Sequence, residues 1–338
     1  MIIIGIDPHK GSHTAVALDE DEHVLAELKV KADARQGELL LGWAAPFDCR
    51  TWAVEAAGGL GALLAQQLVA AGETVLDVPP ALSARVRLLG SGNSDKTDSH
   101  DARSAAVVAL RNPRLRVVGG EDQRAVLRML ADRRHDLVGV RTQAVCRLHA
   151  LLCLLKAGGM GRELTAARAA MVLAGIRPTD AVGVERKRIC AEIVADVRRL
   201  DARIADVRAR IVVAVAASKT TVTDVFGVGP VGAALILGHT GDVSRFPSRH
   251  HFARYNATAP ISASSGPRER HRLNPRGNRQ LNHALHVAAV TQIRNDTPGR
   301  AYYLSKVEDG KSSREALRAL KRRISDAVWR QLLVDASR

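Results

Sequence analysis

Four carboxylates in the first third of the chain have the types and positions expected of a metal site. Asp7 ends the apolar run IIIGID, and Glu55 ends a second short apolar run, TWAVE. Asp98 and Asp101 are three residues apart at the start of a predicted helix, so they share one face of it. Clustered carboxylates repel one another unless a cation neutralises them, and hard oxygen ligands suit Mg²⁺ or Mn²⁺. Two such ions can clamp the attacking and leaving oxygens of a phosphodiester.

Each of these acids also has a simpler interpretation as a solvated loop residue, and Asp101 as the cap of its helix. Lys10 and Lys96 flank the acids and are candidates to contact a phosphate, although solvated lysines would have the same pattern. The nearby histidines have no partner at zinc spacing, so we assign them at most a supporting role. It is the grouping of all four acids that predicts the site.

A second candidate for chemistry is the segment PISASSGPRERHRLNPRGNR, in which Ser264 and Ser265 precede Gly266. Most serines beside a glycine only make turns. Here, however, the neighbourhood is rich in arginine, as expected of a loop that approaches a phosphate. A serine must be activated before it attacks a phosphodiester, and a metal site reached from another domain could activate it. The arginines predicted to bind nucleic acid are Arg268, Arg270, Arg272, Arg276 and Arg279.

A Gly-x-Gly turn, formed by Gly227 and Gly229, precedes an apolar helix and resembles a helix-hairpin-helix element, with a helix expected on either side. Such a turn exposes backbone N–H groups at a helix start, which suits a phosphate. A tight turn between helices that binds nothing would use the same glycines.

Around these residues, the first 110 positions alternate strand and helix signals. Three apolar strands, the last two joined by the polar tip DEDE, are followed by a helix, a strand, a helix, a strand and further helices. Three antiparallel strands followed by this alternation predict an α/β domain of the RNase H-like (RuvC-like) class. In that sheet the strands ending at Asp7 and Glu55 are neighbours, so both carboxylates reach one edge.

The middle of the chain is predicted to be helical. Apolar residues between Cys190 and Ile211 step by three and four, with charges between them, over about three heptads. The pattern predicts a coiled coil, paired within or between chains, and glycines and a proline at 157–185 predict a hairpin of two long helices. We therefore expect a catalytic domain at 1–115, a helical coiled-coil and dimerisation segment at 120–217, and a mainly helical C-terminal domain at 218–338 that ends in a basic helical tail.

The charge distribution points to nucleic acid. The net charge is +15 over 338 residues. It is −3 over residues 1–120, +7 over 121–240 and +11 over 241–338, which suggests chemistry in an acidic head and binding by a basic body. Only 3% of residues are aromatic, too few for a single-strand stacking platform. Scattered cysteines and the lack of a long apolar run predict a cytoplasmic, nucleoid-associated protein without a membrane partner.

Taken together, these motifs resemble the DEDD-type insertion-sequence transposases, a family related to the Piv DNA invertase. The resemblance covers nearly the whole chain and rests on GIDPHK, AVEAAGG, KTDSHDA, GVGPVGAALIL, SSG and RGNRQLNHAL, in that order. It departs from the family at ATAP, where Gly-Leu-x-Pro is usual, and at Pro275, where a Lys is frequent. Matching the motifs assigns the four catalytic acids to Asp7, Glu55, Asp98 and Asp101, and the serine to Ser265 rather than Ser264.

The resemblance implies a site-specific recombinase that moves its own insertion element. It implies a RuvC-like domain whose acids hold Mg²⁺ (or Mn²⁺), and a C-terminal transposase domain whose serine forms a covalent phosphoserine link to DNA. The partners implied are donor and target double-stranded DNA, a structured bridge RNA that pairs with both, and a second chain in a dimer that assembles to a tetramer.

Two other functions remain open on the sequence. One is a metal-dependent nuclease or Holliday-junction resolvase that uses the four acids and water without a covalent step. The other is a basic scaffold that binds nucleic acid and keeps only a relic of the acidic site. A trapped protein–DNA adduct would indicate a recombinase, because a hydrolytic nuclease forms none. Strand cleavage would exclude the scaffold, which does not cut DNA.

Overall fold

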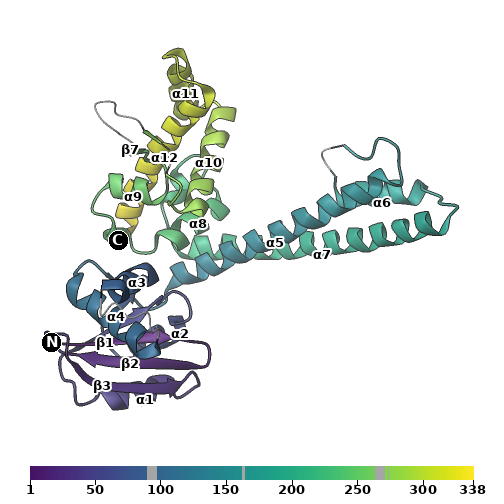
Figure 1. The fold of residues 1–338 in the computed structure, drawn as a ribbon. Helices are drawn as coiled ribbons and strands as arrows, with labels where there is room; N and C mark the ends of the chain where they lie inside the picture. The colour runs from purple at the N-terminus through teal and green to yellow at the C-terminus, as the bar shows by residue number, and fades with distance from the viewer. Residues whose placement is uncertain (90–96, 162–163, 263–270, 273) are drawn as a thin grey trace. The chain divides into compact units, whose positions relative to one another are not determined.

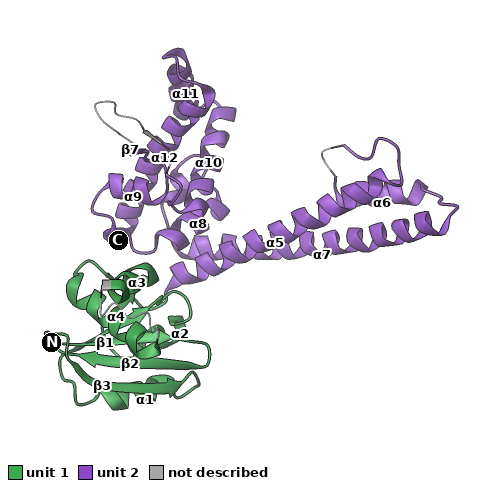
Figure 2. Ribbon diagram, in the orientation of Figure 1, with its two compact units in different colours: residues 1–121 green, residues 122–338 purple. Residues whose placement is uncertain are grey.

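The computed structural model describes residues 1–89, 97–161, 164–262, 271–272 and 274–338. The chain divides into two compact units, Met1–Glu121 and Asp122–Arg338 (Figure 2). The first unit is α/β and the second is almost entirely helical (Figure 1). The predicted fold class is thereby confirmed at this level, while the three-part division at 115–120 and 217–218 stays a prediction.

The first unit is built on one mixed six-stranded sheet with the order β3-β2-β1-β4-β5-β6. Strand β2 runs antiparallel to β1 and β3, whereas β1, β4 and β5 are parallel. This is the arrangement expected of an RNase H-like domain from the sequence. The strands are β1 (Ile2–Pro8), β2 (Ser12–Leu18), β3 (Val24–Lys31), β4 (Arg50–Glu55), β5 (Val75–Val78) and β6 (Arg116–Val117).

Helices cover both faces of this sheet. Ile4 and Ile6 of β1 pack in one cluster with side chains of α1 (Gln36–Ala44) and α2 (Ala62–Ala70). Ile3 of the same strand packs in another cluster with the alanines of α4 (Asp98–Arg111), beside α3 (Pro80–Leu89). Burial on both faces explains why β1 is an unbroken apolar run rather than an alternating one.

The second unit begins with a helical hairpin made by α5 (Gln123–Cys153) and α7 (Ala181–Ala217), with α6 (Ala166–Gly175) between them in sequence; α5 and α7 lie side by side (Figure 1). The heptad residues of α7 pack within the chain. Cys190 and Val197 lie in a cluster with residues of α5 and α6, and Ile211 lies in a cluster with residues of α5 and α8. The predicted hairpin is therefore present, and its apolar seam is covered by the same chain.

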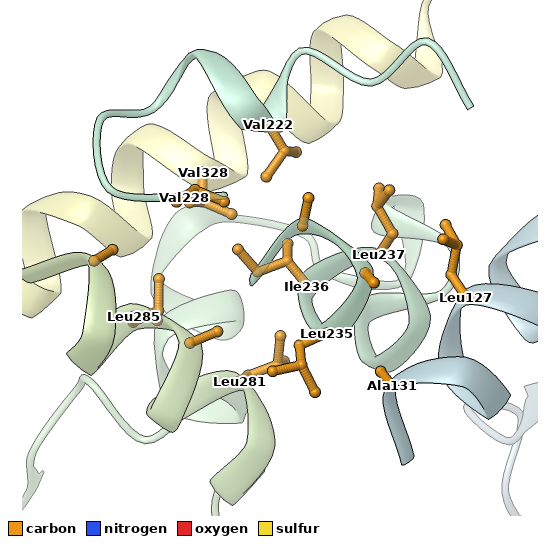
Figure 3. Packing of buried hydrophobic residues seen from close by; sticks show 14 of the residues in the cluster. Leu127, Ala131, Val222, Val228, Leu235, Ile236, Leu237, Leu281, Leu285 and Val328 are labelled. Carbon is orange, nitrogen blue, oxygen red and sulfur yellow. The ribbon is translucent and has the colours of Figure 1, made fainter. Parts of the chain in front are cut away.

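The remaining helices enclose the largest apolar cluster of the unit (Figure 3). Helix α8 is buried on nearly all sides, with Leu235, Ile236 and Leu237 among its inward-facing residues. Helices α5, α10 and α12 contribute Leu127, Leu281 and Val328 to the same cluster. The elements are η1 (Val222–Asp224), α8 (Pro230–Thr240), η2 (Val243–Arg245), α9 (Arg249–Tyr255), β7 (Ile261–Ser262), β8 (His271–Arg272), α10 (Arg279–Arg294), α11 (Pro298–Glu308) and α12 (Ser313–Ala336).

The structure differs from the sequence-based expectation at several short elements. The residues just before Gly227 form a single 3₁₀ turn, η1, where a helix was expected. Strands β6, β7 and β8 were not predicted, because two-residue strands are too short to show a periodicity. Helix α4 begins at Asp98, so both Asp98 and Asp101 lie at its start, as expected from the sequence. No helix within the described ranges is both long and apolar enough to cross a bilayer.

Candidate active site of the N-terminal unit

The sheet register brings Asp7 and Glu55 to one edge. Strands β1 and β4 are parallel neighbours, and Ile6 is paired with Val54. Asp7 and Glu55 follow these two residues and so lie at the same end of their parallel strands. Glu55 is followed by Ala56, whose φ of 49° lies in the left-handed region. A non-glycine residue in this region is locally strained, and such strain is often found beside functional sites.

A close approach between β1 and α4 brings the other two acids to this edge. A Cβ on Gly5 would lie 2.0 Å from the carbonyl oxygen of Ala102 and 2.8 Å from the amide nitrogen of Ala106. Only glycine therefore allows α4 to pack directly on the strand that carries Asp7. The start of the helix, with Asp98 and Asp101, is placed by this contact.

Thr97, and not Asp101, is the N-cap of α4, since its hydroxyl accepts a hydrogen bond from the backbone N–H of His100 at 3.3 Å. The simpler interpretation of Asp101 as a helix cap is thus wrong. Both Asp98 and Asp101 lie in the first turn of the helix, where the helix dipole stabilises negative charge. Asp101 is nevertheless only 7% exposed and Asp7 only 8%, and carboxylates this buried are rare unless a cation neutralises them.

The acids lie close enough to affect one another. Single ligand atoms of Asp7, His9 and Asp98 all lie within 4.8 Å of one another, and Nδ1 of His9 is 3.4 Å from Oδ2 of Asp7. Burial raises the pKa of Glu55, and repulsion from Asp7 and then Asp101 raises it further. The ionised form of Glu55 is therefore disfavoured in this arrangement, as expected of a cluster with excess negative charge.

Two basic side chains offset part of this charge. The Lys29 ammonium on β3 donates a hydrogen bond to Oδ2 of Asp98 at 2.7 Å. Arg87 on α3 forms an ion pair with Asp101. Neither residue stands out in the sequence: Lys29 lies 69 positions before Asp98, and nothing in its local sequence marks it.

The donor set suits a hard divalent cation. Asp7, Glu55, Asp98 and Asp101 offer carboxylate oxygens, the preferred ligands of Mg²⁺ and Mn²⁺. His9 adds a nitrogen donor within reach of two of them. Burial, followed by repulsion from Asp7 and Asp101, raises the pKa of Glu55, and a divalent cation would offset the repulsion.

The structure says less about the residues predicted to contact nucleic acid and about the predicted serine. Lys10 is exposed in the turn after β1, and Arg276 and Arg279 are exposed in the second unit. Arg272 belongs to the short strand β8. Four of the predicted residues and the alternative serine lie outside the described residues: Lys96, Ser264, Ser265, Arg268 and Arg270.

The two glycines of the Gly-x-Gly turn differ in their surroundings. Gly227 has a φ of +85°, and a Cβ there would lie 2.8 Å from the carbonyl oxygen of Ala288 in α10. Its identity is thus required by the fold alone, whether or not a ligand binds. Gly229 is the N-cap of α8 and has open space beside its Cα. Binding of nucleic acid by this turn stays a prediction.

Comparison with protein families places both ends of the chain among transposases. A family model described as "Transposase" matches residues 4–156, which contain all four acids. A model described as "Transposase IS116/IS110/IS902 family" matches residues 219–304.

Curated relatives match along almost the whole chain. The 44.8 kDa protein of insertion element IS116 from Streptomyces clavuligerus is 30% identical, over 98% of this chain and 94% of its own length. The 42 kDa protein of insertion element IS900 from Mycobacterium paratuberculosis is 28% identical, over 97% of this chain and 94% of its own. Among solved structures, Thermus thermophilus RuvC in complex with a Holliday junction substrate aligns with 35% of this chain and 99% of its own, at 15% identity and a TM-score of 0.29.

Proposed function

Because the chain belongs to the IS110/IS116 family of insertion-element transposases, we propose that it cuts and rejoins the DNA of its element at a divalent-metal site formed by Asp7, Glu55, Asp98 and Asp101. The observation that carries this proposal is the cluster around the buried Asp7. Ligand atoms of Asp7, His9 and Asp98 lie within 4.8 Å of one another, and Glu55 is repelled by both Asp7 and the buried Asp101.

The residues would act as metal ligands and as a charge balance. Bound Mg²⁺ or Mn²⁺ supplies Lewis-acid stabilisation of the attacking and leaving oxygens of a phosphodiester. Asp7 and Asp101 are held rigidly by burial in the sheet and the helix, whereas Asp98 is about 40% exposed and has more room to adjust. Glu55, whose ionised form is disfavoured by burial and by repulsion from Asp7 and Asp101, would become fully ionised on ligating a cation. Lys29 and Arg87 then lose their role as counter-ions and become available to a DNA phosphate.

The finer steps of the proposal rest on the resemblance of the motifs. Ser265 would attack the scissile phosphorus, so that a serine–phosphate bond forms and the bond from phosphorus to the leaving DNA oxygen breaks. The leaving oxygen takes up the proton that the serine loses and becomes a DNA hydroxyl. A second DNA hydroxyl later displaces the serine and rejoins the strand. We propose the same family partners: donor and target duplexes, a bridge RNA that selects them, and a dimer that pairs into a tetramer.

The distribution of charge supports a division of labour. The net charge is −3 over residues 1–120 but +7 over 121–240 and +11 over 241–338. A region this basic binds the phosphate backbone with an affinity that falls steeply with salt. DNA would thus be held mainly by the second unit, while the acids of the first unit provide the chemistry.

The decisive experiment compares Asp7→Asn with Asp21→Asn, a matched control that removes an exposed carboxylate of the same unit. Strand cleavage and DNA binding are measured with Mg²⁺, with Mn²⁺ and with chelator. Asp7→Asn should abolish cleavage and leave DNA binding largely intact, while Asp21→Asn retains both. Normal cleavage by Asp7→Asn would contradict the proposal. Cleavage without any protein–DNA adduct would instead favour a nuclease or junction resolvase.

A further inference from the structure

The second unit contains a cavity of about 1070 Å³ between α10, α12 and two connecting segments. Residues 257–260 lead from α9 into β7, and residues 274–277 precede α10; both segments line the cavity. Pro260 and Asn274 therefore flank, in sequence, the segment that carries Ser264 and Ser265. No Phe, Tyr or Trp lines the cavity within the described residues, so it offers no aromatic surface on which a base could stack.

The cavity wall is strongly basic. Its single described carboxylate, that of Glu315, is already used at the start of α12, where it accepts hydrogen bonds from the backbone N–H of Ser312 at 3.0 Å and from the Ser312 hydroxyl at 2.6 Å. Two histidines of α10, His283 and His286, add groups that can become cationic. The charged side chains of the wall are Arg279, Lys311, Glu315, Arg318, Lys321 and Arg322.

Lys321 is held in place by a chain of hydrogen bonds to uncharged groups. It is partly buried, and its ammonium donates a hydrogen bond to Oδ1 of Asn282 at 2.6 Å. The amide of Asn282 donates in turn to the carbonyl oxygen of Asn256 at 2.9 Å, and the fully buried Asn256 donates to Oγ of Ser325 at 2.8 Å. Within the described part of the chain, no carboxylate lies within ion-pair distance of Lys321. A partly buried ammonium held only by uncharged dipoles is an arrangement that favours an incoming anion.

The electrostatics of the neighbouring groups agree with this geometry. Burial lowers the pKa of Lys321, and the nearby Arg318 lowers it further. Burial also lowers the pKa of His286, with added repulsion from Lys321 and His283. An anion in the cavity would reverse these effects and favour the protonated forms. Binding should therefore take up protons and become tighter as the pH falls.

We propose that this cavity binds phosphate groups of the DNA backbone, with Lys321 as the central contact and Arg279, Arg318 and His286 around it. The proposal rests on the proposed function, because that function makes DNA the anion available to the second unit. A phosphate held here would be fixed beside the two ends of the segment that carries Ser265. The pocket would thus position the strand for the serine and contribute affinity that is independent of base sequence.

The test measures binding of the full chain to short DNA duplexes of different sequence by fluorescence anisotropy. The titrations are repeated over a series of salt concentrations. Chelator is present throughout, so that the readout needs neither bound metal nor cleavage. Lys321→Met should weaken binding equally on all sequences and reduce the slope of log affinity against log salt by about one. Lys321→Arg, which keeps the charge, should retain the slope. Lys306→Met removes a lysine of α11 that does not line the cavity and is the matched control.

Proton uptake gives an independent readout. Calorimetry in buffers of different ionisation heat should show protons bound by the wild-type chain on DNA binding near neutral pH, and fewer by His286→Asn. Two results would contradict phosphate binding by the cavity. One is an unchanged slope of log affinity against log salt for a folded Lys321→Met chain, and the other is equal proton uptake by wild type and His286→Asn. If these results were found while Asp7→Asn still abolished cleavage, the phosphate-binding cavity would be contradicted and the metal site would not. Failure of the one proposal is therefore distinguishable from failure of the other.

Discussion

The ammonium of Lys29 lies 2.7 Å from Oδ2 of Asp98, although the two residues are 69 positions apart in the chain. This hydrogen bond raises the pKa of Lys29, with further attraction from Asp98 and Asp7. Lys29 therefore occupies the position of a counter-ion for two of the acids assigned to the metal. A divalent cation that binds there must compete with it.

Replacing Lys29 by Met should tighten the binding of Mn²⁺ to the chain several-fold, because the repulsion between the ammonium and the metal is removed. Isothermal titration with Mn²⁺ measures the change. Arg111→Met is the control, since Arg111 pairs with Glu22 at the other end of α4. Equal Mn²⁺ affinities for wild type and Lys29→Met would contradict the prediction, because they would show that Lys29 does not oppose metal binding.

Glu55→Gln should stabilise the first unit at neutral pH when metal is absent. The folded-state pKa of Glu55 is raised by burial and by Asp7 and Asp101, so its ionisation destabilises the folded state. Stability should fall as the pH rises from the ordinary glutamate pKa through the raised one, and Gln removes that loss. Thermal unfolding in chelator should show the gain above this window and little difference below it.

Saturating Mn²⁺ should abolish or reverse the advantage of Glu55→Gln, since the wild-type carboxylate then gains a ligand interaction. Glu38→Gln, which changes an exposed glutamate of α1, should behave like wild type throughout. A destabilised Glu55→Gln in chelator at neutral pH would show that Glu55 is paired favourably without metal.

Gly5→Ala should destabilise the first unit by about 3 kcal/mol or more, because the new methyl group would overlap the backbone of α4. Gly42→Ala in α1 is the control, since a Cβ there meets nothing within 4 Å. It should be neutral or stabilising by up to about 1 kcal/mol. Urea unfolding compares the two. If Gly5→Ala folds normally, cleavage should still drop, because α4 must shift and carry Asp98 and Asp101 with it.

Val197→Asp should destabilise the α5–α7 hairpin by about 3 kcal/mol or more, because Val197 is fully buried among residues of the same chain. Val184→Asp, on the same helix but 53% exposed, should change stability by less than about 0.5 kcal/mol. Circular dichroism during denaturation measures both.

Light scattering on the folded Val184→Asp chain then tests whether the exposed side of α7 mediates the proposed self-association. A normally stable Val197→Asp would contradict the intrachain seam.

Ser265→Ala should remove both strand exchange and any covalent protein–DNA product, whereas Ser264→Ala should be milder. Metal binding by the four acids should survive either change, because the serines belong to the other unit. The adduct is trapped on DNA with the guide RNA present, digested, and its modified peptide identified by mass spectrometry. A phosphodiester on Ser264, or a fully active Ser265→Ala chain, would overturn the assignment.

The sequence alone was enough to predict most elements of the first unit, and it singled out four acids whose role as a metal site remains a prediction. Periodicity and turn residues predicted five of the six strands, and apolar runs that end in an acid pointed to Asp7 and Glu55. The prediction of the strands succeeded because the side-chain pattern of a buried parallel strand and the order of the elements are local properties of the chain. The assignment of Ser265 likewise came from a motif and remains a prediction.

Only the tertiary structure decided which groups meet. Lys29 and Arg87 approach the acids from β3 and α3, and the basic cavity around Lys321 is assembled from α10, α12 and two loops. No local pattern reports such encounters, since they depend on how distant segments pack. The same holds for Gly5, whose need to be glycine arises from a helix that begins more than ninety residues later. The residue types thus pointed to a metal site, whereas the basic side chains that balance the charge of its acids were brought there by packing.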